Sequence, residues 1–222
     1  MRVIAFLDGE MGLYADKVLR EHPDVDLVAR HPGKIVPSDV DWIQSLKPDI
    51  GISAGYRHLF ARDDIALFPK GIVNVHTSLL PTGRGAHPNA WALYEGLHLT
   101  GVTLHQVDEG VDTGPILAHE LVHILPWDDA HSLQQRLLRA ARDLLIATIP
   151  RIPVIKPKDQ GVGQRGRRKA EFAEMDEIDL DAATTARDVL NHLRARTYPG
   201  CEPAHFWTGE RKVYVSLSLR PE

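Results

Sequence analysis

Short apolar runs alternate with stretches of helical periodicity through the first half of the chain. The apolar runs predict strands over 3–7, 25–29, 50–53 and 71–76. Between them, apolar residues at helical spacing predict helices over 11–19 and from an N-cap at Ser38 to Leu46. This alternation is typical of crossover units in a parallel sheet, whose ligands bind beyond the carboxyl ends of the strands. Candidate chemistry is therefore expected at the strand ends, which are Asp8, Ser53 and residues 74–76.

The pattern changes in the second half of the chain. It predicts a helix over 86–95, extended segments over 101–107 and 116–125, and a long amphipathic helix over 129–149. Residues 150–169 are rich in Pro, Gly and basic side chains, which is typical of a linker or surface loop. A helix over 184–195 and a hairpin with strands over 204–207 and 212–219 complete the pattern.

These elements predict an α/β fold with a Rossmann-like, mostly parallel sheet and helices on both faces. We expect the sheet to form one domain over residues 1–150. Residues 151–222 would form a linker and a small C-terminal subdomain of one helix and one hairpin. The apolar residues of this hairpin could pair across the two-fold axis of a homodimer or cover the protein's own sheet; they are Tyr214, Val215, Leu217 and Leu219.

Composition and charge narrow the class of protein. The chain has 222 residues, with 26 Lys and Arg against 30 Asp and Glu, and its net charge is −4. This balance argues against nucleic-acid or membrane-surface binding. No apolar run approaches the roughly 18–20 residues of a membrane span, and no signal-peptide core precedes Asp8. Cys201 is the only cysteine, so no internal disulfide can form, and we expect it to be structural and dispensable. The sequence predicts a cytoplasmic enzyme.

One motif matches a metal-site pattern but lies in the wrong predicted context. Residues 119–123 match the H-E-x-x-H pattern of zinc proteases, which requires a helix. Pro115 and Pro126 bound the segment, and its apolar residues occupy both parities, so we interpret it as a strand. Two histidines four residues apart on a strand lie about 13 Å apart and could not share a zinc ion. We expect no metal site.

A second motif matches a cofactor pattern. Residues 161–166 match the G-x-G-x-x-G pattern of dinucleotide sites, but no predicted strand precedes them, so we interpret them as a loop. The overlapping basic run 165–169 is most simply solvated, although it could also contact phosphates.

A third constellation could carry chemistry. Asn74 and His76 lie on one face of a predicted strand end, and Asp112 lies in a loop between two glycines. An imidazole can take the proton of an attacking amine, an amide can donate to an oxyanion, and a carboxylate can orient the imidazole or a water. Such residues could transfer an acyl group to an amine without a Ser or Cys nucleophile. A structural histidine and a simple Gly-Asp turn are the alternatives.

At these residues the sequence resembles a known family. Asn74-x-His76-x-Ser78-Leu79-Leu80-Pro81, followed by Val111-Asp112-Thr113-Gly114, is similar to the folate-dependent formyltransferases. The resemblance implies a formyltransferase catalytic domain over 1–150, with Asn74, His76 and Asp112 as its catalytic residues. It also implies N10-formyltetrahydrofolate as the formyl donor. Two loops would line the donor, and their implied contact residues are Tyr56, Arg57, His58, Leu59, Asp108, Gly110 and Val111.

Within the family, segments 84–92, 101–114 and 193–200 resemble the branch that formylates amino sugars carried on nucleotides. This implies an acceptor amine, most simply on C4 of a deoxy sugar, and a role in surface glycan biosynthesis. We expect sugar-nucleotide contacts from Ser78, Arg84, Gly85, His87 and Trp91. A rigid turn and a helix start, with the tryptophan in the core, are the alternative reading of that segment.

Other acceptors are less well matched. The C-terminal subdomain is too small for the barrel domain with which methionyl-tRNA formyltransferases grip tRNA, and the charge is not basic. Asp8 and Glu10 occupy the loop where glycinamide ribonucleotide enzymes hold a phosphate. Formylation of hydroxyornithine, hydrolysis of formyltetrahydrofolate, and a folate- or nucleotide-binding module without activity remain as alternatives.

Overall fold

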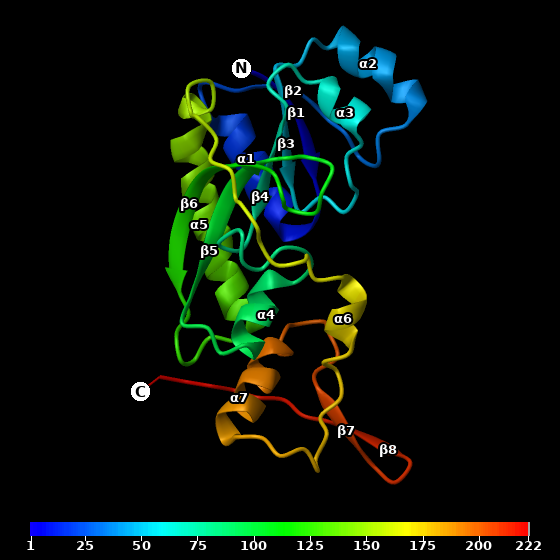
Figure 1. Ribbon diagram of the computed structural model, residues 1–222, viewed down its shortest axis with the longest axis vertical. Helices are drawn as coiled ribbons and strands as arrows, with labels where there is room; N and C mark the ends of the chain where they lie inside the picture. Colours follow the sequence, from blue (N-terminus) through cyan, green and yellow to red (C-terminus); the bar gives the residue numbers. More distant parts are fainter. Residues whose placement is uncertain (222) are drawn as a thin grey trace.

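The structure is a computed structural model that describes residues 1–221, and it contains a six-stranded sheet flanked by helices (Figure 1). The strand order is β2-β1-β3-β4-β5-β6. These strands are β1 (Arg2–Leu7), β2 (Asp26–Arg30), β3 (Ile50–Ala54), β4 (Ile72–His76), β5 (Leu99–Gln106) and β6 (Ile116–His123). The first four pair in parallel, whereas β5 and β6 pair antiparallel. The predicted α/β fold with a mostly parallel sheet is confirmed.

Helices cover the two faces of the sheet unequally. They are α1 (Gly9–Glu21), α2 (Val40–Ser45), α3 (Arg62–Ala66), α4 (Pro88–Tyr94), α5 (Ala130–Thr148), α6 (Lys169–Ala173) and α7 (Ala186–Ala195). One face packs against α1 and α5 in the larger apolar core, to which Val73 and Val75 of β4 contribute. The other face holds a smaller apolar core that includes Phe6, Ile43 and Ile72. Because side chains alternate along a strand, Asn74 and His76 share this second face with Ile72.

Several predicted boundaries differ from the structure. Ser38 does not cap a helix; it lies inside a 3-10 turn (Pro37–Asp39), after which α2 begins at Val40. Asp39 makes the contact at this turn instead, because its carboxylate accepts from the backbone N–H of Val36 at 2.8 Å. The long helix begins at its cap Asp129, as predicted. The short helices α3 and α6 were not predicted, since five residues carry too little periodicity to be recognised.

The C-terminal segment adds a helix and a hairpin, as predicted. Helix α7 packs against α4, and β7 (His205–Thr208) and β8 (Arg211–Tyr214) form a separate two-stranded sheet (Figure 1). The second hairpin strand ends at Tyr214, five residues earlier than predicted. None of the helices in residues 1–221 is long and apolar enough to cross a membrane.

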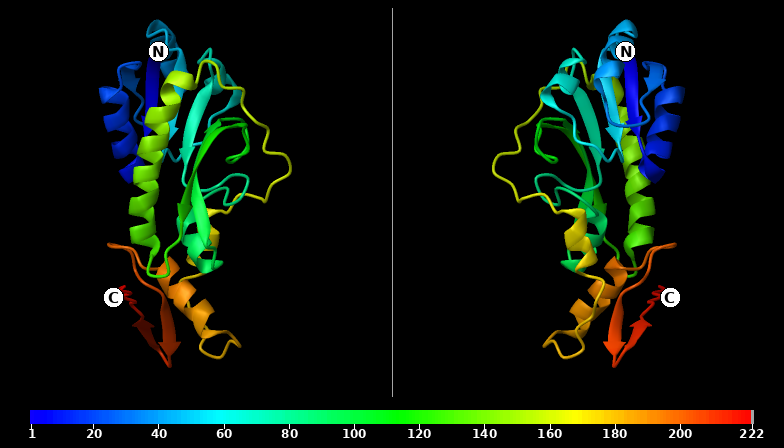
Figure 2. Two further views of the ribbon diagram at one scale, coloured as in Figure 1. Left: turned by 90° about the vertical axis from the view of Figure 1, so that its left-hand side faces the viewer. Right: turned by 90° about the vertical axis from the view of Figure 1, so that its right-hand side faces the viewer.

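Residues 150–169 form a surface loop, one of the two predicted alternatives, and isolated bridges bind this loop to the rest of the protein. A 3-10 turn (Ile149–Arg151) follows α5, and the chain then crosses the sheet face opposite α1, as Figure 2 shows. Lys158 forms an antiparallel bridge with Ile116, and Arg167 forms a parallel bridge with Gly85. We call residues 158–167 the strap. Its composition predicted a linker or surface loop, but composition alone does not reveal bridges to residues distant in the sequence.

Candidate active site

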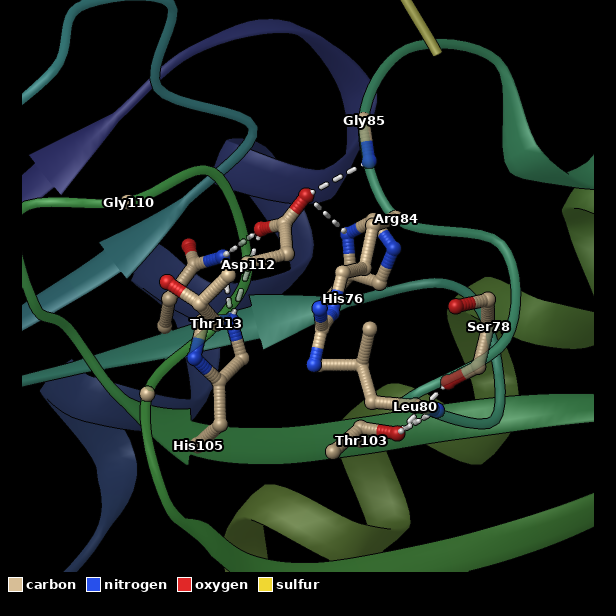
Figure 3. Close-up of polar contacts among 12 residues, drawn as sticks. His76, Ser78, Leu80, Arg84, Gly85, Thr103, His105, Gly110, Asp112 and Thr113 are labelled. Carbon is tan, nitrogen blue, oxygen red and sulfur yellow. Dashed lines mark hydrogen bonds and ion pairs between the residues drawn. The ribbon is translucent and has the colours of Figure 1, made fainter. Parts of the chain in front are cut away.

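Four segments meet at the second face of the sheet (Figure 3). Asn74 and His76 come from β4, and His105 lies opposite Asn74 on β5. Asp112 comes from the connection between β5 and β6, residues 107–115, which we call the Asp112 loop. Residues 82–87, the glycine-rich loop, close the site from the other side. The structure therefore brings together the three side chains that the sequence predicted to be catalytic.

Asp112 lies at the centre of the contacts. Its Oδ2 accepts from the backbone N–H of Gly85 at 2.8 Å and lies 3.6 Å from His76 Nδ1. Its Oδ1 lies 3.5 Å from His105 Nε2 and 3.5 Å from Asn74 Nδ2. The side chain is only 14% exposed, and its backbone has a left-handed φ of 54°. An aspartate is among the residues that tolerate this conformation best.

The surroundings keep Asp112 ionised. Burial acts to raise the pKa of its carboxyl, but the nearby rings of His76 and His105 and the N–H of Gly85 outweigh that effect. The net result is a pKa well below the usual aspartate range. Asp112 therefore presents a fixed negative charge to both histidines at neutral pH.

His76 has an acceptor at each ring nitrogen. Its Nε2 lies 2.9 Å from the carbonyl oxygen of Gly83, while Nδ1 faces Asp112. A carbonyl and a carboxylate both accept hydrogen bonds, so the doubly protonated ring satisfies both contacts. To accept a proton from an amine, His76 must first release one of these contacts.

His105 belongs to the same cluster, although the sequence did not single it out. Its side chain is 3% exposed, its Nδ1 lies 2.7 Å from the carbonyl oxygen of Gln106, and its Nε2 lies 3.1 Å from Asn74 Nδ2. The carbonyl requires a proton on Nδ1, which leaves Nε2 of the neutral ring as an acceptor for the Asn74 amide. The pairing of β4 with β5 is the signal that could have identified it.

A buried threonine supports the segment that follows β4. Thr103 is fully buried, and its hydroxyl donates to the carbonyl of Ser78 at 2.6 Å and accepts from the N–H of Leu80 at 3.1 Å (Figure 3). These bonds fix the chain immediately after His76, from which the glycine-rich loop begins.

The predicted sugar-contact residues lie around the glycine-rich loop and are largely engaged with the protein. The hydroxyl of Ser78 donates to the carbonyl of Thr82 at 2.7 Å. Arg84 is buried, and its guanidinium donates a hydrogen bond to Gln160 Oε1. The ring of Trp91 is covered by the guanidinium of Arg167 at 4.0 Å. A pocket of about 120 Å³ lies between this loop and α4, and Ser78, Arg84 and Trp91 are among its lining residues.

The remaining two sugar-contact candidates have other surroundings. The N–H of Gly85 is bound to Asp112, as described above. His87 has a left-handed φ of 55°, and its ring stacks on Phe172 of α6 at 4.3 Å between centroids. Burial and the nearby charges of Lys169 and Arg196 lower the pKa of His87, which favours the neutral ring.

The two loops predicted to line a formyl donor have exposed apolar tips. Leu59 is 64% exposed and Val111 is 43% exposed. Tyr56 donates to the carbonyl of Gly33 at 2.7 Å and stacks on Phe60, and burial and Asp64 raise its pKa to about 12. A flat aromatic ligand against these loops would bury the two apolar tips.

The other predicted members of these loops are polar or lack a side chain. Arg57 pairs with Asp8 at 2.8 Å, and the ring of His58 meets that of Tyr56 edge-on. Asp108 accepts from the N–H of Gly110 at 3.0 Å and from the hydroxyl of Thr113 at 2.6 Å. These contacts fix the shape of the loops but do not identify a ligand.

The two motifs set aside on sequence grounds lie where predicted. His119 and His123 are on strand β6, and residues 161–166 are part of the strap, with no strand directly before them. Within residues 1–221, no group of three or more His, Cys, Asp or Glu side chains is arranged to hold a metal ion. A second concavity, of about 630 Å³, lies at the far end of the parallel strands beside Met1, away from this cluster.

Comparison with known families gives the cluster a context. A family model described as formyl transferase matches residues 19–149, more than half of the chain. The chain belongs to the formyl transferase family. A second model, described as the N-formyltransferase dimerization C-terminal domain, matches residues 171–221 of this formyl transferase. The predicted resemblance to formyltransferases is therefore confirmed.

Individual relatives of this formyl transferase differ in the acceptor that their names give. A methionyl-tRNA formyltransferase from Halorhodospira halophila is 37% identical over 203 residues, which cover 88% of this chain and 64% of the relative. The chain therefore spans less than two thirds of that relative's length. A Mycobacterium tuberculosis protein described as a candidate sugar N-formyltransferase gives a TM-score of 0.85 at 26% identity, over 100% of this chain and 97% of that one.

A further structure of this fold has been solved with ligands. The formyltransferase PseJ from Anoxybacillus kamchatkensis, in complex with UDP-4,6-dideoxy-4-formamido-L-AltNAc and tetrahydrofolate, gives a TM-score of 0.68 at 23% identity. The match covers 86% of this chain and 97% of that chain. Similarity at this level of identity establishes the shared fold.

Proposed function

We propose that this protein transfers a formyl group from N10-formyltetrahydrofolate to the amine of a nucleotide-linked amino sugar. The observation that carries the proposal is the convergence of Asn74, His76 and the ionised Asp112 on one sheet face. This set provides an amide donor, a proton acceptor and a fixed charge. It provides no activated Ser or Cys nucleophile, which suits direct attack by an amine.

The proposed reaction proceeds through a tetrahedral adduct. The amine nitrogen of the acceptor attacks the formyl carbon, and the carbonyl oxygen becomes an oxyanion. The Asn74 amide stabilises it with the N–H that it releases from Asp112 Oδ1, a contact of 3.5 Å. The amine loses a proton to His76, once the ring has released the Gly83 carbonyl, and Asp112 stabilises the imidazolium. The oxyanion then re-forms the carbonyl, the bond from the carbon to N10 of the folate breaks, and N10 takes up the proton that His76 had accepted.

The choice of a sugar acceptor rests on two lines of support. One relative that matches this chain from end to end is described as a candidate sugar N-formyltransferase, and residues 171–221 match the N-formyltransferase dimerization model. The 37% identical relative is named for methionyl-tRNA, so that acceptor remains the principal competitor. PseJ carries a 4-formamido sugar linked to UDP, which supports an amine on C4 as the first acceptor to test.

The first turn of α1 argues against a ribonucleotide phosphate. Asp8 caps this helix. Its Oδ1 accepts a hydrogen bond from the N–H of Gly9 at 2.9 Å, and its Oδ2 forms an ion pair with Arg57. A helix N-terminus attracts anions, but here a carboxylate already occupies it. A terminal phosphate would meet that charge, so we disfavour glycinamide ribonucleotide as the acceptor.

The formyl donor fits the two loops that flank the cluster. Leu59 and Val111 offer apolar contact for a pterin, and the backbone of the Asp112 loop offers polar groups beside it. Contacts from Tyr56, Arg57, His58, Leu59, Asp108, Gly110 and Val111 are part of this proposal. A cytoplasmic location and a role in surface glycan biosynthesis are also part of it.

The C-terminal hairpin is proposed to form a homodimer interface. Trp207 and Tyr214 are 47% and 45% exposed, and the ammonium group of Lys212 lies within 6 Å of both ring centroids, at 5.5 and 5.7 Å. The match of this segment to a dimerization domain supports pairing of two copies through it. Val215, Leu217 and Leu219 follow the hairpin and are half-buried against their own chain, so they offer less surface to a partner.

Mass spectrometry would test the acceptor directly. Purified protein would be incubated with N10-formyltetrahydrofolate and a panel of amino sugars on dTDP, GDP and UDP, with methionyl-tRNA and a reaction without acceptor beside them. We expect one formyl group on one sugar and none after His76→Ala, whereas His123→Ala at the exposed end of β6 should keep the activity. Formylation of methionyl-tRNA alone would overturn the sugar proposal. Formate released without an acceptor would instead indicate a hydrolase.

A further inference from the structure

Gln160 of the strap connects the two loops that enclose Asp112. Its amide Nε2 donates to the carbonyl oxygens of Asp112 and Gly114, at 3.0 and 2.6 Å. Its Oε1 accepts from Nε and Nη2 of Arg84, at 3.2 and 2.7 Å. The side chain of Gln160 thus binds both the backbone of the Asp112 loop and the Arg84 side chain of the glycine-rich loop.

Arg84 depends on the strap for its polar partners. The residue is 7% exposed, and within residues 1–221 no carboxylate forms an ion pair with it. In the described part of the chain, the other hydrogen-bond partner of its guanidinium is the backbone carbonyl of Gln164, at 3.5 Å. A buried cation requires acceptors, so Gln160 and Arg84 fix each other's orientation.

Glycines allow the strap to approach this closely. A Cβ atom at Gly163 would lie 2.7 Å from Cζ of Arg84, and one at Gly85 would lie 2.2 Å from the carbonyl oxygen of Arg167. Gly85 also has a φ of +92°, which side chains rarely adopt. The G-x-G-x-x-G motif therefore has a structural reason in this chain, because its middle glycine passes over the Arg84 guanidinium.

These contacts close a ring around the carboxylate. Asp112 Oδ2 accepts from the N–H of Gly85; the neighbouring Arg84 binds Gln160; and Gln160 binds the carbonyl of Asp112. The ring constrains the left-handed backbone of Asp112 and the direction of its side chain at the same time.

We propose that Gln160 is a positioning residue that holds Asp112 against His76 through the two carbonyls of the Asp112 loop. The expected effect of Gln160 on the reaction rate rests on the formyl transfer proposed above. Its expected effect on the position of the Asp112 loop does not. Because Gln160 contacts two backbone carbonyls and Arg84 but not the Asp112 carboxylate, its loss should lower kcat more than it changes the KM for either substrate.

Two substitutions distinguish the contacts that Gln160 makes as a donor from those that it makes as an acceptor. Gln160→Leu removes both kinds of contact. Gln160→Glu has the same size and keeps an acceptor for Arg84, but it presents oxygen to the carbonyls of Asp112 and Gly114. Gln164→Leu is the matched control, since Gln164 is an exposed strap residue whose contact with Arg84 uses only its backbone.

The first readout is hydrogen exchange of the Gly85 amide by NMR, which requires no substrate. We expect exchange to accelerate roughly 3- to 10-fold in both Gln160 variants and to stay unchanged in Gln164→Leu. The second readout is kcat, which should fall about 10- to 100-fold in both variants.

Each outcome is decisive. Unchanged Gly85 exchange in the Gln160 variants, equal acceleration in Gln164→Leu, or full activity of Gln160→Glu would overturn the positioning role. Faster exchange with unchanged kcat would overturn its link to the chemistry. The wild type could also formylate no acceptor while Gly85 exchange is still faster in the Gln160 variants. That result would support the role of Gln160 in holding the loop, and only the proposed function would fail.

Discussion

The ionised carboxylate of Asp112 lies 3.6 Å from the ring of His76, and the proposed chemistry depends on that pair. The carboxylate accepts from the backbone N–H of Gly85 and lies within 3.6 Å of two imidazole rings, and its pKa is depressed although burial opposes this. A permanent anion beside His76 favours the imidazolium, which is the state that forms when the amine loses its proton. The site is therefore arranged for charge that develops during the reaction.

Asp112→Asn should lower kcat by on the order of 100-fold or more, because the amide keeps the shape of the side chain but not its charge. Formylation rates at saturating substrate would measure the effect. Asp63→Asn, a change of the same kind in the first turn of α3, should leave kcat unchanged. Similar kcat values for wild type and Asp112→Asn would contradict an electrostatic role.

The same carboxylate predicts a pH dependence of folding stability. A pKa that is lower in the folded than in the unfolded state stabilises the fold above the unfolded pKa of about 3.9, and this stability is lost as the pH falls through the folded pKa. The difference in free energy of unfolding between wild type and Asp112→Asn should therefore be steady from pH 7 to pH 5 and shrink below about pH 4. Urea unfolding at a series of pH values would measure it, and a difference that grows on acidification would contradict the assignment.

Thr103→Val should destabilise the fold by about 1–3 kcal/mol, because it leaves the Ser78 carbonyl and the Leu80 N–H without their buried partner. Urea unfolding would measure the change. Thr100→Val, on the same strand and also buried, is the matched control and should cost less. Equal losses for both variants would indicate that the Thr103 hydroxyl is unimportant.

For individual residues, the sequence identifies those that share one face of a strand better than those that are distant in the sequence but in contact in the fold. Period-two alternation placed Asn74 and His76 on one face, and the structure agrees. His105 could be recognised only from the register of β5 against β4, which depends on the packing of the whole sheet. Gln160 meets a carbonyl 48 residues earlier in the chain, and no local pattern encodes that contact.

The elements of the C-terminal subdomain are joined to the rest of the molecule mainly by α7. Arg194 donates from Nε to the carbonyl of Asp128 at 2.6 Å and from Nη2 to that of Leu125 at 2.8 Å. These carbonyls lie just before α5, so one side chain fixes α7 to the start of the longest helix. The amphipathic pattern predicted α7 itself, but not this anchor, because a basic residue late in a helix is equally common on open surfaces.

Arg194→Ala should loosen α7 locally, by about 2 kcal/mol, since it leaves two carbonyls without a charged donor. Hydrogen exchange over residues 186–195 would report this as faster exchange. Arg187→Ala, at the exposed start of the same helix, should not change the exchange rates. Faster exchange throughout the chain would instead point to global destabilisation.

At the scale of the whole molecule, the exposed hairpin aromatics predict how two copies associate. Trp207→Asp or Tyr214→Asp should convert a dimer to a monomer, because each places a charge where an apolar surface would be buried. Light scattering after size-exclusion chromatography would show half the mass. Leu13→Asp on α1, also exposed, should leave the dimer intact. A dimer that survives both hairpin changes would place the interface elsewhere.

The strap also limits how this protein could exchange parts with its relatives. Beyond the predicted domain boundary at residue 150, Gln160 and Arg167 bind the Asp112 loop and the glycine-rich loop. A chimera joined at residue 150 would pair one parent's loops with the other parent's strap. A crossover after Arg167 would exchange only the C-terminal subdomain. All residues of the ring of contacts around Asp112 would then come from a single parent. Recombination, in evolution or in the laboratory, should therefore succeed more often at the second junction.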